Sequence, residues 1–466
     1  MDASRNSVNM ALVGAIVAVA TIGGLLFGYD SGAVNGTQGG LVAEFGLSDA
    51  ALGFTVGSLL IGCAVGAFFA GRLADAMGRR NVMLIAAVLF LVGALVQGFT
   101  DVHMIFVLAR FAGGMAVGAA SVLSPLYISE VAPANIRGRL TTVQQVMIIT
   151  GLTAAFVVNY LLAQSAGDSL GEIAGREAWR WMYLAQAVPA AVFLVALLFI
   201  PESPRYLVSR KREQEALAVL ARLFGAEEAE RKVVEIRKTF SDDHRPRLRD
   251  VTAPGTGFRP IVWAGIMLAT FQQFVGINII FYYGETLWKL AGVSEEVALE
   301  RNVVSGLVSI AAVFAALMVI DKVGRKPLLM TGSLGMGVTL AAMTWAFSGA
   351  ATDAAGNLAL SETAGYTALI AANLYVIFFN FSWGPVMWVM LGEMFPNQIR
   401  GSALAVAGLA QWGANYLVVQ SFPAMASGLG LAGTYSLYTI SAFVSFFLVR
   451  KFIRETKGKE LEEMEG

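Results

Sequence analysis

The stretch FQQFVGINIIFYYG, residues 271–284, lies inside a long apolar run. It places Gln272, Gln273 and Asn278 where a membrane span should carry hydrocarbon, and buried amides are costly in lipid unless they find partners. Gly276 lies between the glutamine pair and the asparagine and is expected to loosen the helix there. Polar side chains at a helix break are typical of transporter substrate sites, whereas amides that bond neighbouring helices only hold a bundle together. This stretch alone leaves both interpretations open.

The composition predicts a polytopic helical membrane protein. The chain has 466 residues, of which 56% are hydrophobic and 14% are charged, whereas soluble domains carry about 25% charged residues. The formal net charge is zero, which gives no indication of a nucleic-acid partner. Cys63 is the only cysteine, so an intrachain disulfide is excluded, and the two histidines form no metal-ligand motif.

Twelve apolar segments approach the length of about 20 residues that a membrane span needs. They are residues 11–31, 52–72, 82–99, 104–124, 141–162, 180–200, 260–284, 303–320, 328–347, 365–391, 402–424 and 431–450. The charged connection 201–258 divides them six and six, with helix-like runs at Glu213–Leu223 and Glu227–Thr239. We therefore expect an all-α membrane protein, organised as an N-terminal six-helix bundle (1–200), a cytoplasmic linker with short amphipathic helices (201–258), a C-terminal six-helix bundle (259–450) and a cytoplasmic tail (451–466).

The distribution of basic residues predicts the orientation. Most of the 33 lysines and arginines lie in the two termini and in the turns after even-numbered spans. The exceptions are Arg110, Arg176, Arg180, Lys289 and Arg301. Because basic residues gather on the inner side of a membrane, both termini are expected to be cytoplasmic.

Short motifs recur in the same order in the two halves. The pairs are DAMGR (75–79) and DKVGR (321–325), EVAPANIRG (130–138) and EMFPNQIRG (393–401), and PESP (201–204) and RETKG (454–458). Two parallel halves related by an axis normal to the membrane place a binding site at their interface. The repeat therefore favours the substrate-site interpretation of residues 271–284.

The order of these motifs, together with QQ-x-x-G-x-N at 272–278, resembles the sugar porter family of the major facilitator superfamily over about residues 22–462. This family includes proton-coupled xylose symporters and facilitative glucose transporters. The resemblance implies two pseudo-symmetric six-helix bundles that carry a neutral monosaccharide, as a monomer, through a plasma membrane such as the bacterial inner membrane.

The resemblance also implies a substrate site. Its positions in this chain are Gln145, Gln272, Gln273, Asn278, Tyr282, Tyr283, Trp388, Gln411 and Trp412, with the tyrosines near the outer gate. Amides donate and accept at once, as sugar hydroxyls do, and indole rings stack on the apolar face of a pyranose. The alternative is that the tryptophans are packing or interfacial residues. Gly384–Pro385 is expected to break the tenth span so that it can bend against the sugar.

Two ionisable residues lie within apolar spans of the first half. Asp30 ends the run GGLLFGYD, and Arg110 lies in VLARFAGG. An ionisable group inside a span is a functional hypothesis by default. The resemblance implies that the two residues face each other and that Asp30 carries the coupling proton, since facilitative members typically have a neutral residue there. The alternative is that Asp30 caps the outer end of its span in water while Arg110 makes a structural pair.

The repeated motifs supply acids and bases at the inner face of both halves. They are Asp75, Arg79, Glu130 and Arg137 in the first half, and Asp321, Arg325, Glu393 and Arg400 in the second. We expect ion pairs between helix ends that form when the cytoplasmic side closes and break when it opens, at about 0–1 kcal/mol each. The alternative is that the basic residues only follow the positive-inside pattern.

The predicted function is proton-coupled import of a neutral monosaccharide. Leu152 stands where xylose symporters of the family have a glutamine and glucose carriers an apolar residue, which favours a hexose such as D-glucose, with D-xylose next. Ser309 is a second departure, since relatives have an asparagine there that reaches the sugar. A facilitative uniporter of the same fold is the alternative, and a sugar sensor is a second one, although a sensor would be expected to carry longer cytosolic tails. The chain has no GxSxG, HExxH or P-loop motif, so neither an enzyme nor a cofactor is expected.

Overall fold

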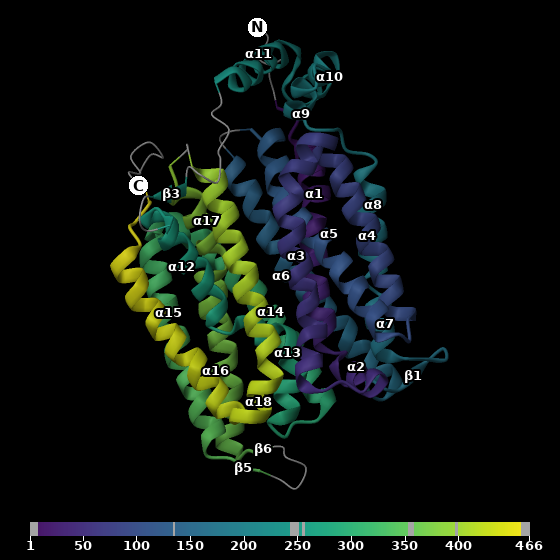
Figure 1. Ribbon diagram of the computed structural model, residues 1–466, viewed down its shortest axis with the longest axis vertical. Coiled ribbons are helices and arrows are strands. Elements are labelled where there is room, and N and C mark those ends of the chain that lie inside the picture. Colours follow the sequence, from purple (N-terminus) through teal and green to yellow (C-terminus); the bar gives the residue numbers. More distant parts are fainter. Residues whose placement is uncertain are drawn as a thin grey trace.

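A computed structural model gives the architecture. It describes residues 8–133, 136–242, 251–253, 257–352, 358–396 and 399–457. In the described chain eleven helices are long and apolar enough to cross a membrane. The last of them, α18 (Arg400–Phe452), bends at Gly430, where φ is 70° and ψ is 171°, and runs back beside its own first part (Figure 1). It therefore crosses twice, and the twelve predicted crossings are confirmed.

Two six-crossing bundles lie side by side (Figure 1). The first consists of α1 (Met10–Asn35), α3 (Asp49–Met77), α4 (Arg79–Phe99), α5 (His103–Val131), α6 (Arg137–Ala166) and the pair α7 (Ala178–Leu184) and α8 (Ala187–Leu197). The second consists of the pair α12 (Pro260–Phe274) and α13 (Ile277–Leu290), α14 (Glu295–Val323), α15 (Arg325–Ser348), the pair α16 (Glu362–Phe381) and α17 (Trp383–Met394), and both arms of α18.

The remaining elements mark the two ends of the molecule. The helices α9 (Pro204–Ser209), α10 (Glu213–Phe224) and α11 (Ala226–Asp242) sit over one end, which we call the linker end (Figure 1). The first residues of α1 and the last of α18 lie at this end as well. The opposite, distal end carries α2 (Gln38–Phe45) and two hairpins, β1 (Glu172–Ile173) with β2 (Arg176–Glu177), and β5 (Ala351–Thr352) with β6 (Leu358–Ala359). A third hairpin, β3 (Thr252–Ala253) with β4 (Gly257–Phe258), precedes α12.

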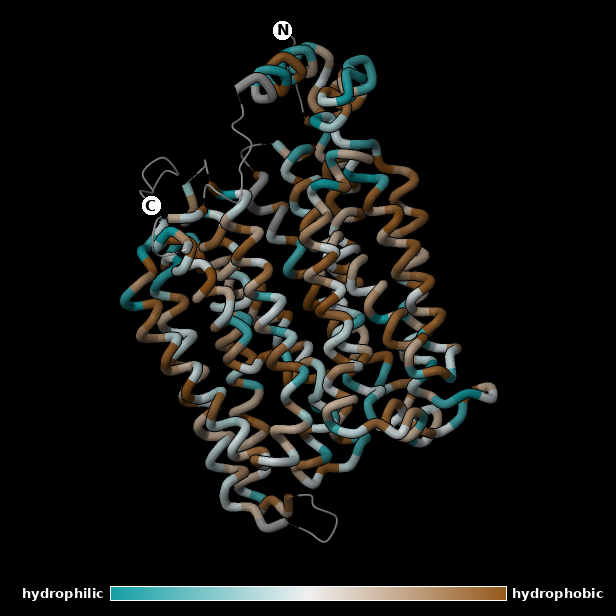
Figure 2. The backbone as a smooth tube through the Cα atoms, in the orientation of Figure 1, coloured by the Kyte–Doolittle hydropathy of each residue, from teal (hydrophilic) through white to brown (hydrophobic). Residues whose placement is uncertain are grey.

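Hydropathy along the helices explains why the chain folds this way. Apolar residues cover the crossing helices, while hydrophilic residues gather at the ends and over α10 and α11 (Figure 2). Large apolar side chains remain exposed on the outer faces, with Phe199 at 80% and Met318 at 68%. In water such a surface would be unfavourable, but it suits hydrocarbon.

One predicted break is displaced in the structure. The tenth crossing breaks at Ser382, where φ is −129° and ψ is −87°, and not at Gly384–Pro385. Pro385 instead lies in the first turn of α17, where its missing N–H leaves no helical bond unmade. The proline therefore lies in the first turn of the second segment, and the change of backbone direction occurs at Ser382.

Candidate functional site

A break between α12 and α13 positions the predicted binding residues. α12 ends at Phe274, α13 starts at Ile277, and Gly276 between them has a φ of 84°. Side chains rarely tolerate this φ, and a Cβ on Gly276 would also lie 2.7 Å from the ring of Tyr438. The break thus depends on glycine for both reasons.

Four predicted amides form one hydrogen-bonded network. Gln273 Nε2 donates to Gln272 Oε1 at 3.0 Å, and Asn278 Nδ2 donates to Gln273 Oε1 at 2.6 Å. Gln411 Nε2 approaches Gln272 Oε1 at 3.5 Å. Asn278 also donates to Asn415 Oδ1 at 2.7 Å, a residue that the sequence analysis missed. Asn415 follows Gln411 by four residues on one helix, and this spacing on a shared helical face was the available signal.

We call these five residues the amide network. Its members are buried or partly buried and bond one another, and among the described residues Gln411 Oε1 has no hydrogen-bond partner. A ligand with several hydroxyls could replace these bonds in kind, because each amide both donates and accepts. A charged ligand would find no counter-charge among the five.

The other predicted binding residues, Trp412, Trp388 and Gln145, differ in burial and in their contacts. Trp412 is 4% exposed, and its ring meets Phe27 of the first half edge-on, with centroids 5.6 Å apart. Trp388 is 42% exposed, and Gln145 is partly buried. Within the described part of the chain, no hydrogen bond joins Gln145 or Trp388 to the amide network. The structure therefore adds Phe27 to the interface, while the roles of Gln145 and Trp388 stay predictions.

The two adjacent tyrosines face different halves. Tyr282 accepts a hydrogen bond from Ser31 Oγ of α1 at 3.1 Å, across the interface. Tyr283 donates to the carbonyl of Val419 at 3.0 Å, within its own half, and packs against Phe422. Tyr283 also has non-helical angles, with φ −117° and ψ 19°, so α13 is kinked at this residue.

Asn35 of α1 inserts its amide into this kink. In a regular helix the N–H of Glu285 would bond the carbonyl of Phe281. Here Glu285 N donates to Asn35 Oδ1 at 2.9 Å, and Asn35 Nδ2 donates to Phe281 O at 2.9 Å. Asn302 Nδ2 adds a bond to Asn35 Oδ1 at 2.7 Å, and a Cβ on Gly284 would lie 2.8 Å from Asn35 Nδ2. We call this arrangement the Asn35 clasp; the sequence analysis missed it.

Further contacts between the halves also lie towards the distal end. Gln38 donates to the carbonyl of Tyr282 and accepts from Thr286 Oγ1. A Cβ on Gly53 of α3 would collide with the carbonyl of Gln420 on α18, so the two backbones touch there. These contacts close the distal end of the interface.

Asp30 and Arg110 face each other inside the first half. Their side chains are 1% and 0% exposed, and Asp30 Oδ2 lies 3.5 Å from Arg110 Nη2. This burial contradicts the alternative in which Asp30 caps its span in water. Arg110 also approaches Gln97 Oε1 at 3.4 Å and the carbonyl of Val56 at 3.3 Å.

The pair is loosely held. Among the described residues, Asp30 Oδ2 and Arg110 Nε have no hydrogen-bond partner within bonding distance. A buried carboxylate with an incomplete set of partners is costly in its charged form. Charge on Asp30 is therefore stabilised mainly by Arg110, and a longer separation between the two side chains would favour the neutral form of the acid.

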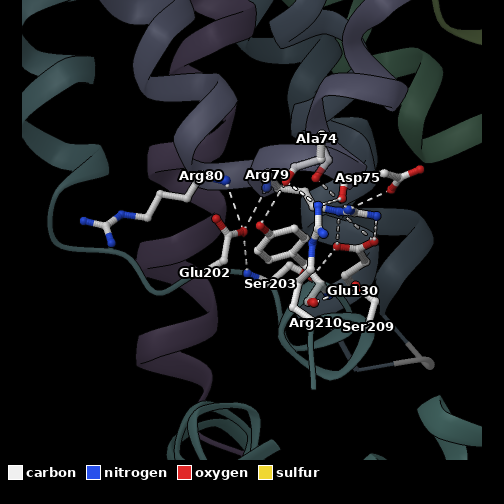
Figure 3. A network of polar contacts seen from close by, with 11 residues as sticks. Ala74, Asp75, Arg79, Arg80, Glu130, Glu202, Ser203, Ser209 and Arg210 are labelled. Carbon is white, nitrogen blue, oxygen red and sulfur yellow. Dashed lines mark hydrogen bonds and ion pairs between the residues drawn. The ribbon is translucent and has the colours of Figure 1, made fainter. Parts of the chain in front are cut away.

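At the linker end, Arg79 ties together three segments of the first half (Figure 3). Its Nη1 lies 3.0 Å from Asp75 Oδ1, and its Nη2 lies 2.9 Å from Glu130 Oε1. Ser203 Oγ donates to Glu130 as well. Glu202 Oε1 accepts the backbone N–H of Arg79 at 2.9 Å, which satisfies the free start of α4.

The second half repeats this arrangement. Arg325 lies 3.0 Å from Asp321 and 2.8 Å from Glu393, and Thr456 Oγ1 donates to Glu393 at 2.6 Å. Glu455 accepts the backbone N–H of Arg325 at 3.0 Å and so satisfies the start of α15. Burial opposes the charge of Glu455, but backbone N–H groups at Lys457, Arg325, Lys326 and Thr456 outweigh it and lower its pKa.

Each of these ion pairs joins residues of one half. The side chain of Arg137 lies outside the described residues, and Arg400 donates to the carbonyl of Phe395 from Nε and Nη2 at 3.2 Å each. The matched pairs disfavour the reading in which these bases only follow the positive-inside pattern. No group of three or more histidine, cysteine, aspartate or glutamate side chains suited to a metal occurs in the described part of the chain.

Comparison with known sequences finds one family over almost the whole chain. The model of the family described as "Sugar (and other) transporter" matches residues 16–466. A "Glucose transport protein" of Synechocystis sp. is 43% identical over 463 residues, which cover 99% of this chain and 98% of that protein. The "D-xylose-proton symporter" of Escherichia coli K12 is 38% identical over 490 aligned positions, which cover 98% of this chain and 96% of that protein.

Solved structures give the same result for the fold. The inward-open xylose transporter XylE from E. coli aligns with a TM-score of 0.81 at 37% identity, over 97% of this chain and 99% of that one. The same symporter bound to 6-bromo-6-deoxy-D-glucose aligns with a TM-score of 0.76 at 36% identity, over 98% of this chain and 99% of that one.

Proposed function

The chain belongs to the sugar (and other) transporter family, within the major facilitator superfamily, and from this premise we propose that it imports a neutral hexose together with a proton. What the family establishes is coarser: the protein is a multi-pass membrane sugar transporter and not an enzyme. The proton, the preferred sugar, the residues that bind each and the orientation belong to the proposal.

The amide network carries the sugar part of the proposal. It lies at a helix break in the middle of the second half, with Trp412 meeting Phe27 across the interface. Gln272, Gln273, Asn278, Gln411 and Asn415 supply donors and acceptors for hydroxyls, and Trp412 supplies an aromatic face. Gln145 and Trp388 complete the site when the halves move. D-Glucose is favoured over D-xylose, in line with the 43% identity to a glucose transport protein.

The buried pair Asp30–Arg110 carries the proton part. A carboxyl that is fully enclosed and incompletely bonded can be neutralised at modest cost, and one arginine beside it controls that cost. In the proposed cycle, Asp30 takes a proton from outside, sugar binds, and the distal end closes through the Asn35 clasp. The linker end then opens to the cytoplasm, where both termini lie, in a bacterial inner membrane.

The test is sugar uptake into proteoliposomes under an imposed pH gradient. Wild-type protein should accumulate labelled D-glucose only while the gradient lasts, and Asp30→Asn should lose accumulation but keep sugar exchange. Glu296→Gln, an exposed acid on α14, is the matched control and should behave as wild type. Uptake that ignores the gradient, with normal active transport by Asp30→Asn, would establish the facilitative uniporter instead.

A competition assay settles the sugar. Labelled D-glucose uptake is measured against unlabelled pentoses, hexoses and polyols. Hexoses should compete at lower concentrations than D-xylose, and stronger competition by D-xylose would contradict the preference. Gln272→Ala should raise the KM about fivefold or more, because it removes at least one hydrogen bond of about 1 kcal/mol, whereas the exposed Gln164→Ala should not.

A further inference from the structure

A second buried carboxyl lies at the distal end of the interface, away from the Asp30 pair. Glu285 of α13 has a side chain that is 2% exposed. Lys289 Nζ lies 3.3 Å from Glu285 Oε1 and also 3.3 Å from Glu295 Oε2. One ammonium is thus shared by two carboxyl groups, and the three residues together carry one negative charge too many if both acids are ionised.

The two acids are not equally supported. Glu295 Oε1 accepts the backbone N–H of Ser169 at 2.6 Å, so both of its oxygens are bonded. Glu285 Oε2 is buried, and among the described residues it has no hydrogen-bond partner. The unpaired charge therefore falls on Glu285, where it is costliest.

The first half lies against the three residues Glu285, Lys289 and Glu295. The N–H of Glu285 is held by Asn35 of α1, and Ser169 belongs to the loop after α6. A Cβ on Gly39 of α2 would lie 3.9 Å from both Lys289 Nζ and Ser169 Oγ, which places the ammonium against the first half. Lys289 and Glu295 are the charged groups that face Glu285, while Asn35 and Ser169 are neutral.

Water reaches the edge of the group formed by Glu285, Lys289 and Glu295. The side chain of Lys289 is 41% exposed and that of Glu295 is 18% exposed, whereas Glu285 is enclosed. When the halves separate at the distal end, Asn35 and Ser169 withdraw and Glu285 meets solvent. A carboxyl that is enclosed in one state and wetted in the other binds a proton more tightly in the enclosed state.

We propose that Glu285 is a second proton-binding site, which takes up a proton from outside as the distal end closes and releases it there as that end opens. The proposal rests on alternating access by the proposed transporter but not on coupling at Asp30. Its consequence has a definite sign: acid outside favours the closed distal end, and alkali favours the open one. Linkage of one proton changes the open-to-closed ratio by up to about tenfold per pH unit.

The test measures the width of the distal interface in the full-length protein. Spin labels are placed at Gln164→Cys and Val297→Cys, one exposed position in each half. The background carries Cys63→Ser, which removes the native thiol, and Asp30→Asn, which removes the buried acid of the Asp30–Arg110 pair. Distances between the labels are recorded in lipid nanodiscs from about pH 5 to about pH 9, a range that spans a buried carboxyl.

The parent should shift towards longer distances as the pH rises. Glu285→Gln should keep short distances at every pH, because the amide imitates the protonated acid. Glu285→Asp should restore a pH response, and the exposed Glu296→Gln should match the parent. A parent that ignores pH, or a Glu285→Gln variant that shifts as the parent does, would overturn the proposal. Since Asp30 is absent throughout, failure here leaves the uptake test of the Asp30 proposal unaffected.

Discussion

The two halves use the same ionic device at the linker end, but they enclose it to different degrees. In the first half the side chains of Arg79 and Glu130 are 8% and 5% exposed. In the second half Arg325 and Glu393 are 12% and 31% exposed. Water screens an exposed pair and replaces its lost partners, whereas an enclosed arginine that loses its acid keeps an unpaired charge. The repeat thus conserves geometry while it changes the cost of breaking each pair.

The largest effect is expected from Glu130→Gln. It leaves the enclosed Arg79 without its bidentate partner and weakens the bond from Ser203, so the free energy of unfolding should fall by about 3 kcal/mol. Unfolding of the purified protein in a denaturing-detergent titration measures this. If the free energy of unfolding fell by less than about 1 kcal/mol, water would have access to the Arg79–Glu130 pair as well.

Glu393→Gln is the matched change in the second half. It should lower the free energy of unfolding by about 1 kcal/mol, because water can solvate the arginine once the negative charge is gone. The same titration provides the comparison. Equal losses for the two variants would remove the distinction between an enclosed and a wetted network.

The stability of Glu455→Gln, measured over a range of pH, tests the contribution of charge at the start of α15. Backbone N–H groups lower the pKa of Glu455, so its stabilising effect is present above the ordinary glutamate value of about 4.3 and is lost as the pH falls through its own lower value. At neutral pH the variant should be less stable by about 0.7 kcal/mol. The difference from wild type should shrink below about pH 4; a constant difference would exclude charge as its cause.

The smallest effects are expected from Asp75→Asn and Asp321→Asn. These acids pair with Arg79 and Arg325, but their side chains are 75% and 77% exposed. Each change should alter the free energy of unfolding by about 0.3 kcal/mol. A larger loss in the first half would mean that Asp75 also orients Arg79 towards Glu130, which the double variant would reveal as non-additivity.

The sequence predicts what depends on composition, spacing and repetition. The twelve crossings follow from apolar length, and the recurrence of DAMGR as DKVGR points to Asp75 and Arg79 and to their counterparts in the second half. The recurrence of a glutamate before each RG motif singled out Glu130 and Glu393. Gly276 was recognised as a break because it separates amides that would otherwise continue one helix.

Residues that act across the interface were missed for a physical reason. Asn35 and Asn302 lie just beyond the predicted spans 11–31 and 303–320, and a polar residue at the end of a span carries no information about the helix it will face. Glu285 was overlooked because it lies near the end of a span, where charge is unremarkable, and only the fold encloses it. The break at Ser382 was assigned to the neighbouring proline because a proline can either break or begin a helix.

The Asn35 clasp has a mechanical consequence. Asn35 bonds both groups that a regular helix would join, the N–H of Glu285 and the carbonyl of Phe281, so these bonds support the bend of α13 only while the halves touch. Once they part, α13 must either leave two polar groups to water or straighten and restore its own bond. Separation of the halves therefore removes a support of the bend and favours a straighter α13, so the shape of this one helix is coupled to the opening of the distal end.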